Sequence, residues 1–139
     1  MLRIFGFAGI VLALTAPALA GSMPMDRPVQ VNGLDTVCTG IGESKDDPRW
    51  LAYPIRIEFS NGGAQYLSGA TLRVSQGGAV IAEMECPGAW VLLKGTPGVY
   101  RVDAAITGSQ GKPVNAPFTM GTGAQKRIVL RFADFQPNQ

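Results

Sequence analysis

Apolar and polar residues alternate with a period of two along most of the chain beyond residue 54. Ile55, Ile57 and Phe59 alternate with polar neighbours, which is typical of a β-strand that buries one face. The same alternation returns in four further stretches, at 70–76, 80–86, 99–106 and 128–132. Residues 90–93 form an apolar run without alternation, which indicates a strand covered on both sides or near a corner. We expect additional strands at 29–38 and around 118–120, with Asn32-Gly33 as a tight turn or a bulge.

Turn residues separate these runs. Pro97-Gly98 fits a type II turn, because proline presets φ at the second position and glycine accepts the positive φ at the third. Tyr100 follows on the apolar face of the next strand, so its hydroxyl needs a partner, which we expect to be a nearby backbone group. About seven short strands, with turn signals roughly every ten residues, predict an all-β protein of the β-sandwich class.

Residues 40–54 are the one helix candidate. Asp47 is a suitable N-cap, and Pro48 suits the first helical position, where its missing N–H costs nothing. Ser44 and Asp47 also have the spacing of a capping box. Since Pro54 ends whatever helix forms, we expect one short helix of about one to three turns.

The first twenty residues have the features of a secretory signal peptide. Arg3 provides a positive charge, residues 4–14 are continuously apolar, and residues 16–20 (APALA) offer small residues before a cut at Gly21. The alternative is a membrane anchor, but a spanning helix needs roughly 20 apolar residues. We predict a signal peptide at 1–20, a flexible tail at 21–28 and one β-sandwich domain at 29–135. The mature protein would be periplasmic or secreted and not embedded in the membrane.

Charge and cysteine content narrow the class of protein. Without Arg3 the chain has eleven Lys and Arg residues against ten Asp and Glu residues, which gives no electrostatic argument for binding nucleic acid or anionic lipid. Cys38 and Cys86 are the two cysteines, and an even pair in an oxidising compartment predicts one disulfide. The alternative, a reactive thiol pair, usually has the close CxxC spacing that these cysteines lack.

Residues 96–104 (TPGVYRVDA) resemble the turn that is the hallmark of carboxypeptidase regulatory-like domains. WVLLKGTPGVYRV is similar to the closing hairpin of that module, and residues 55–81 are similar to its front half. Residues 31–43 (VNGLDTVCTGIGE) are similar to small exported proteins of this kind in proteobacteria. The resemblance covers residues 31–132 and implies a transthyretin-like, or prealbumin-like, fold, which is a seven-stranded Greek-key β-sandwich. It also implies a domain that is usually non-catalytic and either accompanies an enzyme or stands alone.

The chain lacks the groups that many enzymes use. It has no histidine, which removes the usual general base near neutral pH and the commonest metal ligand, and with them Ser-His-Asp and Cys-His catalysis. One transthyretin-like relative, hydroxyisourate hydrolase, relies on histidines and a C-terminal Tyr-Arg-Gly-Ser, whereas this chain ends in FQPNQ. We interpret two acidic groups as solvated charges, namely Glu43, Asp46 and Asp47, and Glu83 with Glu85. We therefore predict no enzyme, no cofactor and no metal.

Four aromatic residues are the most informative side chains for binding. Trp90 lies in the most apolar run and is expected in the core. Trp50, Tyr53 and Tyr66 are candidate ligand-binding residues, because exposed rings stack on sugars or hold a peptide, although Trp50 also suits packing over the sandwich. The favoured function is an exported module that binds another protein or an envelope component, with free strand edges for pairing. The alternative is a carbohydrate-binding module that uses these three aromatic residues.

Overall fold

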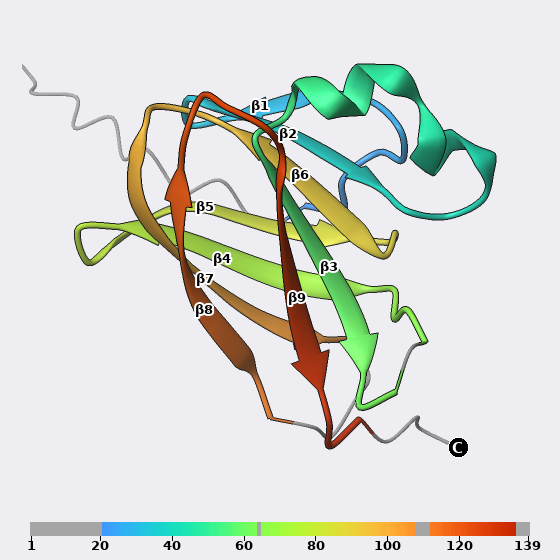
Figure 1. Cartoon of the computed structure of the whole chain (residues 1–139). Helices are drawn as coiled ribbons and strands as arrows, with labels where there is room; N and C mark the ends of the chain where they lie inside the picture. The colour runs from blue at the N-terminus through green and yellow to red at the C-terminus, as the bar shows by residue number, and fades with distance from the viewer. Residues whose placement is uncertain (1–20, 64, 108–111, 136–139) are drawn as a thin grey trace, which may run out of the picture.

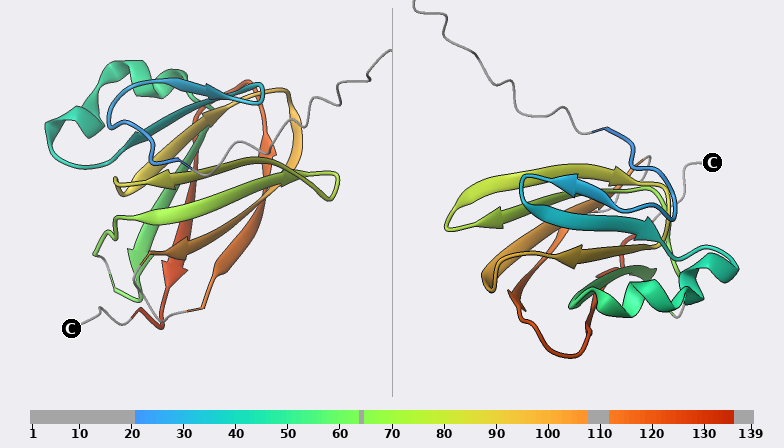
Figure 2. Two further views of the ribbon diagram at one scale, coloured as in Figure 1. Left: turned by 180° about the vertical axis from the view of Figure 1, so that it is seen from behind. Right: turned by 90° about the horizontal axis from the view of Figure 1, so that it is seen from above.

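The computed structural model describes residues 21–63, 65–107 and 112–135, which form a sandwich of two sheets (Figure 1). The five-stranded sheet has the order β1-β2-β6-β3-β9, with strands at Val29–Val31, Leu34–Thr39, Trp90–Lys94, Ile55–Asn61 and Lys126–Phe132. The four-stranded sheet has the order β5-β4-β7-β8, with strands at Ala79–Cys86, Ala70–Gln76, Gly98–Ile106 and Val114–Met120. Neighbouring strands are antiparallel except β3 and β9, which run parallel. Figure 2 shows the two sheets from behind and from above.

The predicted all-β sandwich is confirmed, but the described residues contain nine strands rather than seven. Part of the difference lies at 29–38, which was expected to be one strand. Asn32 and Gly33 have φ values of 46° and 83°, so the chain reverses there in a two-residue turn. Val29–Val31 and Leu34–Thr39 are consequently separate strands that pair with each other.

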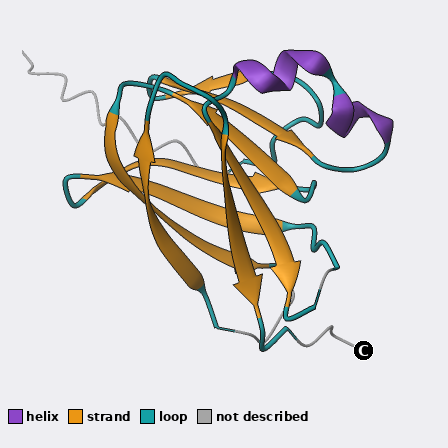
Figure 3. Ribbon diagram, viewed as in Figure 1, coloured by secondary structure: helices purple, strands orange, loops and turns teal. Residues whose placement is uncertain are grey.

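Residues 43–52 form two 3-10 helices, η1 (Glu43–Asp46) and η2 (Pro48–Ala52), instead of the single short helix that was predicted (Figure 3). The break falls at Asp47, whose ψ is 124°, because the residue before a proline is pushed out of the helical region. Asp47 does cap η2, accepting a hydrogen bond of 2.9 Å from the Arg49 N–H. The expected capping box is not formed, since the Ser44 hydroxyl bonds to Asp26 and to the carbonyl of Ile41.

Alternate residues of both sheets meet in one core. Ile55, Ile57 and Phe59 of β3 are at most 1% exposed and pack with inward residues of the opposite sheet, as the period of two predicted. Tyr100 is buried in this core, and its hydroxyl donates a hydrogen bond of 2.5 Å to the carbonyl of Thr96. The backbone partner expected for this tyrosine is therefore confirmed.

A disulfide joins Cys38 on β2 to Cys86 on β5. Both cysteines are fully buried, and they belong to different sheets. The bridge that the cysteine count predicted therefore fastens the two layers of the sandwich to each other.

Residues 21–28 are packed against the sandwich, which corrects the expectation of a flexible tail. The Met23 N–H donates to the carbonyl of Glu85 at 2.8 Å, and the Asp26 N–H donates to the carbonyl of Cys38 at 2.8 Å. Met23 is 6% exposed and belongs to the core cluster. Small residues and prolines suggested a tail, but the apolar methionine side chain gains by burial against the edge of β5.

Residues 1–20, where the signal peptide is predicted, lie outside the described residues. Within the part of the chain that is described, no helix is both long enough and apolar enough to cross a membrane.

Candidate ligand-binding face

The five-stranded sheet has an outer face, defined here as the side turned away from the four-stranded sheet. Because side chains alternate along a strand, the residues between the core positions point to this face. β3 contributes Arg56, Glu58 and Ser60, which alternate with its buried Ile55, Ile57 and Phe59. The outer face also receives side chains from the neighbouring strands, namely Val37, Trp90, Leu92, Arg127, Val129 and Arg131.

Trp50 covers one end of the outer face. Its ring is 4% exposed and packs on Val37 and Leu92, with the half-buried Tyr53 beside it. The Trp50 indole N–H donates to the carbonyl of Ser44 at 2.7 Å, so the polar atom of this buried ring has a partner. Trp50 is therefore the side chain that fixes η1 and η2 to the sheet.

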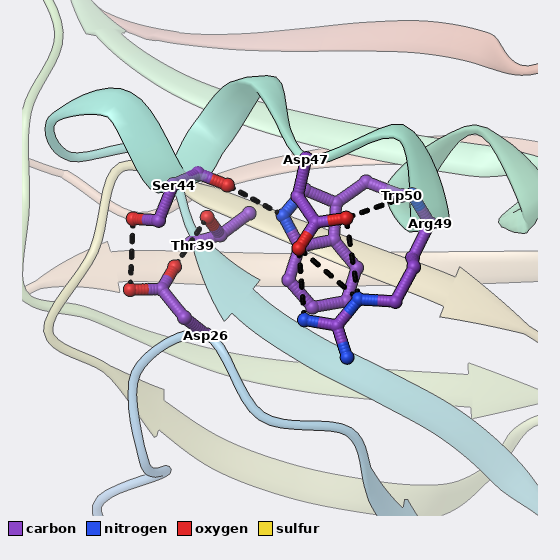
Figure 4. A network of polar contacts seen from close by, with 6 residues as sticks. All are labelled: Asp26, Thr39, Ser44, Asp47, Arg49 and Trp50. Carbon is purple, nitrogen blue, oxygen red and sulfur yellow. Dashed lines mark hydrogen bonds and ion pairs between the residues drawn. The ribbon is translucent and has the colours of Figure 1, made fainter.

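Figure 4 shows polar contacts that connect η1 to the N-terminal segment and others that lie within η2 and its cap. The Asp26 carboxylate accepts hydrogen bonds from the hydroxyls of Thr39 and Ser44, at 2.7 and 2.9 Å. Further along, the Arg49 guanidinium pairs with the Asp47 carboxylate at 2.8 Å. Hydrogen bonds from Arg49 hold the pKa of Asp47 below its ordinary value, so this predicted helix-start acid is ionised at neutral pH.

Glu58 occupies the centre of the outer face and is fully buried there. Arg127 donates to both carboxylate oxygens, with 2.9 Å from Nη2 to Oε1, and Arg56 Nε lies 2.9 Å from Oε2. Burial alone would raise the pKa of Glu58, but hydrogen bonds from Arg127 and Tyr66 and the charges of both arginines hold it below its ordinary value. Glu58 is thus an ionised carboxylate whose oxygens are already occupied.

Two aromatic rings stand beside this ion-pair cluster. The Arg56 guanidinium lies over the ring of Trp90, 4.4 Å from its centroid, an arrangement that the ring quadrupole favours. The Tyr66 ring meets Trp90 edge-on, with 6.0 Å between centroids. Tyr66 reaches this place because the chain after β3 folds back, so that the Leu67 N–H bonds to the carbonyl of Phe59 and Tyr66 lies opposite Ser60.

Two hollows flank the cluster. The first, of about 250 Å³, lies between η1–η2 and β6, and its lining includes Trp50, Arg56 and Trp90. The second, of about 470 Å³, lies at the other end of the face, and we call it the Ser60 hollow. It is lined by Ser60, Gly62, Gly63, Tyr66, Arg127, Val129 and Arg131.

Each hollow is lined by a residue that has a buried polar side-chain atom without a hydrogen-bond partner among the described residues. In the first hollow this atom is the indole Nε1 of Trp90, and in the second it is the hydroxyl of Ser60. The two residues are 7% and 5% exposed. Buried polar groups in folded proteins nearly always have a partner, so these two atoms are an unusual feature of the outer face.

The three predicted aromatic residues do not form one exposed patch. Trp50 is buried and meets Tyr53 at 6.2 Å between ring centroids, whereas Tyr66 packs on Trp90. Of the three, Tyr66 is the most open, at 43% exposed. Trp90, expected in the core, is buried, yet it lies on the outer face rather than between the sheets.

Sequence reasoning missed the ion-pair cluster and the two hollows. The signal available was the charge on alternate outward positions, Arg56 and Glu58 in one strand and Arg127 and Arg131 in another. What brings them together is the parallel register of β3 and β9, which sets Arg56 beside Arg127 and Ser60 beside Arg131. That pairing joins segments about 70 residues apart, a distance that periodicity alone does not bridge.

The acidic groups noted in the sequence are dispersed in the structure. Glu83 pairs with Arg73 at 2.9 Å on the four-stranded sheet, and Asp47 pairs with Arg49. Among the described residues, no three His, Cys, Asp or Glu side chains gather in a way that would hold a metal ion.

Comparison with known proteins adds no relative, because neither the models of known protein families nor the curated proteins contain a match to this chain.

Proposed function

We propose that this chain is an exported, non-catalytic β-sandwich module that binds another protein or a cell-envelope component through the outer face. The observation that carries the proposal is a pair of buried donors, Ser60 Oγ and Trp90 Nε1, for which the described part of the chain offers no partner and whose residues line two hollows of the same face. An unmade hydrogen bond in a buried site is unfavourable, and a ligand rich in acceptor atoms would remove that cost at both ends.

The state of Glu58 supports binding rather than catalysis. A general acid near neutral pH needs a raised pKa, and a general base needs a free oxygen within reach of its proton. The pKa of Glu58 is lowered, and both of its oxygens accept hydrogen bonds from arginines. Together with the absence of histidine from the sequence, this favours a role for Glu58 in positioning the arginines.

Three features support export and the prealbumin-like arrangement. The disulfide between the sheets is of the kind that persists in oxidising compartments. If the β1–β2 hairpin is set aside, β3 to β9 are seven strands divided between two sheets, the number expected for a carboxypeptidase regulatory-like domain. The turn before Tyr100, where the resemblance is most specific, has its tyrosine buried and bonded to Thr96. The Greek-key connection remains a prediction.

The edge of β9 offers a surface for main-chain pairing. β9 ends the five-stranded sheet and pairs with β3 on one side only (Figure 1). The other edges are less open: β8 contains Pro117, β1 has three residues, and β5 bonds to residues 21–23. Proline and short length both oppose strand addition, so a partner strand would be favoured at β9, next to the outer face.

The carbohydrate-binding alternative now depends on Tyr66. Trp50 is buried, but Tyr66 is exposed beside a hollow and touches Trp90. A sugar stacked on Tyr66 would change the surroundings of Trp90, so tryptophan fluorescence titrated with envelope polysaccharides tests this function. A flat response across the panel would exclude it.

Retention of an envelope component tests the favoured function. The mature protein, residues 21–139, is immobilised and exposed to a periplasmic and envelope extract of its source cell, together with the variants Tyr66→Ala and Arg101→Ala. Arg101 is exposed on the other sheet and provides the matched control. We expect a component that the wild type and Arg101→Ala retain and that Tyr66→Ala loses. Equal retention by all three proteins, or none by the wild type, would contradict the proposal.

A further inference from the structure

We infer that the Ser60 hollow is an oxyanion site, which takes a phosphate or carboxylate group between Arg127 and Arg131 with Ser60 as a hydrogen-bond donor. The inference rests on the proposed function, because it names the chemical group by which the outer face recognises its partner.

The position of the hollow follows from the parallel pairing of β3 and β9. Both strands end at the same edge of the sheet (Figure 1), and Ser60 is the register partner of Arg131. Their side chains therefore stand next to each other on the outer face. The segment after β3 closes the other side, where the Gly63 N–H bonds to the Asn61 side chain at 2.8 Å and Tyr66 lies opposite Ser60.

The charges around the hollow leave a positive excess. The single negative charge of Glu58 is shared by Arg56 and Arg127, so these three groups keep one net positive charge. Arg131 adds another and makes no ion pair with a described residue. Guanidinium groups bind carboxylates and phosphates with paired hydrogen bonds, which makes an oxyanion the group that this lining suits.

The Ser60 hydroxyl gives the second, independent observation. It belongs to a residue that is 5% exposed, and it has no hydrogen-bond partner among the described residues. A surface arginine alone would be an ordinary solvated charge. An arginine beside a buried, unpaired hydroxyl instead gives two hydrogen-bond donors from neighbouring residues of one hollow, which suits an oxyanion.

The first hollow does not have a lining with an excess of positive charge. Its lining contains the carboxylates of Asp46 and Asp47 together with Lys45 and Arg56, so its charges are mixed. Within the described ranges, no Asp or Glu lines the Ser60 hollow. An anion would thus be repelled in part at one end of the outer face and attracted at the other.

Titration with inorganic phosphate and, separately, with acetate tests the inference. Chloride keeps the ionic strength constant, and amide chemical shifts of the mature protein report binding at residues 60–63 and 127–131. We expect at least one of the two anions to bind there. Arg131→Gln should weaken this binding about tenfold, since it removes a charge-assisted donor. Arg101→Gln, the matched control on the other sheet, should leave the affinity unchanged.

The variant Ser60→Ala separates a site from a merely structural hydroxyl. Removing an unpaired buried hydroxyl should leave the melting temperature equal or higher, while anion affinity falls severalfold. Unchanged affinity in both Ser60→Ala and Arg131→Gln, an equal loss in Arg101→Gln, or no binding of either anion would overturn the inference.

The two proposals fail in distinguishable ways. If neither anion binds but Tyr66→Ala still loses the envelope component, the oxyanion site is wrong and the function stands. If an anion binds at Ser60 but nothing is retained, the site stands and the function is wrong. The source of the group is settled on the retained component itself. Phosphatase treatment should abolish the retention of a component that presents phosphate, and amidation of its carboxyl groups should abolish the retention of one that presents a carboxylate.

Discussion

Trp50 is a residue for which the structure decides between two interpretations of the sequence. The ring was a candidate both for ligand stacking and for packing over the sandwich, and its burial on Val37 and Leu92 supports packing. We predict that Trp50→Ala lowers the free energy of unfolding by about 3 kcal/mol or more. Leu51→Ala, at a neighbouring residue that is 72% exposed, should change it little. Urea unfolding of both variants measures the difference, and equal stabilities would contradict this role.

Glu58 makes stability depend on pH. Its pKa is lowered in the folded protein, so the ion pairs stabilise the fold fully above the unfolded-state value, near 4.5, and this contribution is lost as pH falls through the lower folded value. Glu58→Gln should cost about 1–2 kcal/mol at pH 7, less than for a wholly buried pair because Arg127 is half exposed. The penalty should shrink as the pH drops below 4.5. Parallel stability profiles from pH 7 to pH 3 would contradict this prediction.

The burial of Ser60 illustrates why the site was not predictable at the residue scale. In sequence it is an ordinary outward position of an alternating strand, next to an Asn-Gly-Gly turn. It becomes buried because that turn returns Tyr66 to lie opposite it and because β9 sets Arg131 beside it. Neither contact leaves a periodic signal.

Among the secondary-structure elements, those that are determined by residues close together in the sequence were predictable. β3 and β7 follow from the period of two, and the cap of η2 follows from Asp47-Pro48. The same proline explains the wrong prediction of a single helix, since it forces Asp47 into an extended conformation. The segment 21–28 was misjudged because its place depends on a distant partner, the edge of β5.

The N-terminal segment gives a test at this scale. Met23 is buried in the core, so Met23→Ala should lower the free energy of unfolding by about 2–3 kcal/mol. Arg27→Ala, at an exposed position of the same segment, is the control and should have little effect. If residues 21–28 were a free tail, Met23→Ala and Arg27→Ala would have the same stability. Thermal unfolding of both variants measures the difference.

At the scale of the whole molecule, the disulfide was predictable from the sequence and also connects the two sheets of the fold. The count of two cysteines predicted a bridge but not its geometry, and the structure places it between the sheets, with 48 residues of separation along the chain. Closing a loop of that size restricts the unfolded chain and contributes about 4 kcal/mol in the chain-entropy account. It does so far from β9, because Cys38 lies on β2 and β6 and β3 intervene between β2 and β9.

Stability and anion binding should therefore respond differently to loss of the bridge. In the double variant Cys38→Ala with Cys86→Ala, the unfolding midpoint should fall by an amount that corresponds to about 4 kcal/mol or less, and a reductant should have no further effect. Phosphate or acetate binding at the Ser60 hollow should persist at temperatures where the variant is folded, since the hollow is lined by β3, β9 and the segment after β3, and neither cysteine lies there. Free thiols in protein recovered from its native compartment would contradict the bridge. Loss of anion binding in the folded variant would mean that the two sheets, and not the outer face alone, hold the Ser60 hollow in shape.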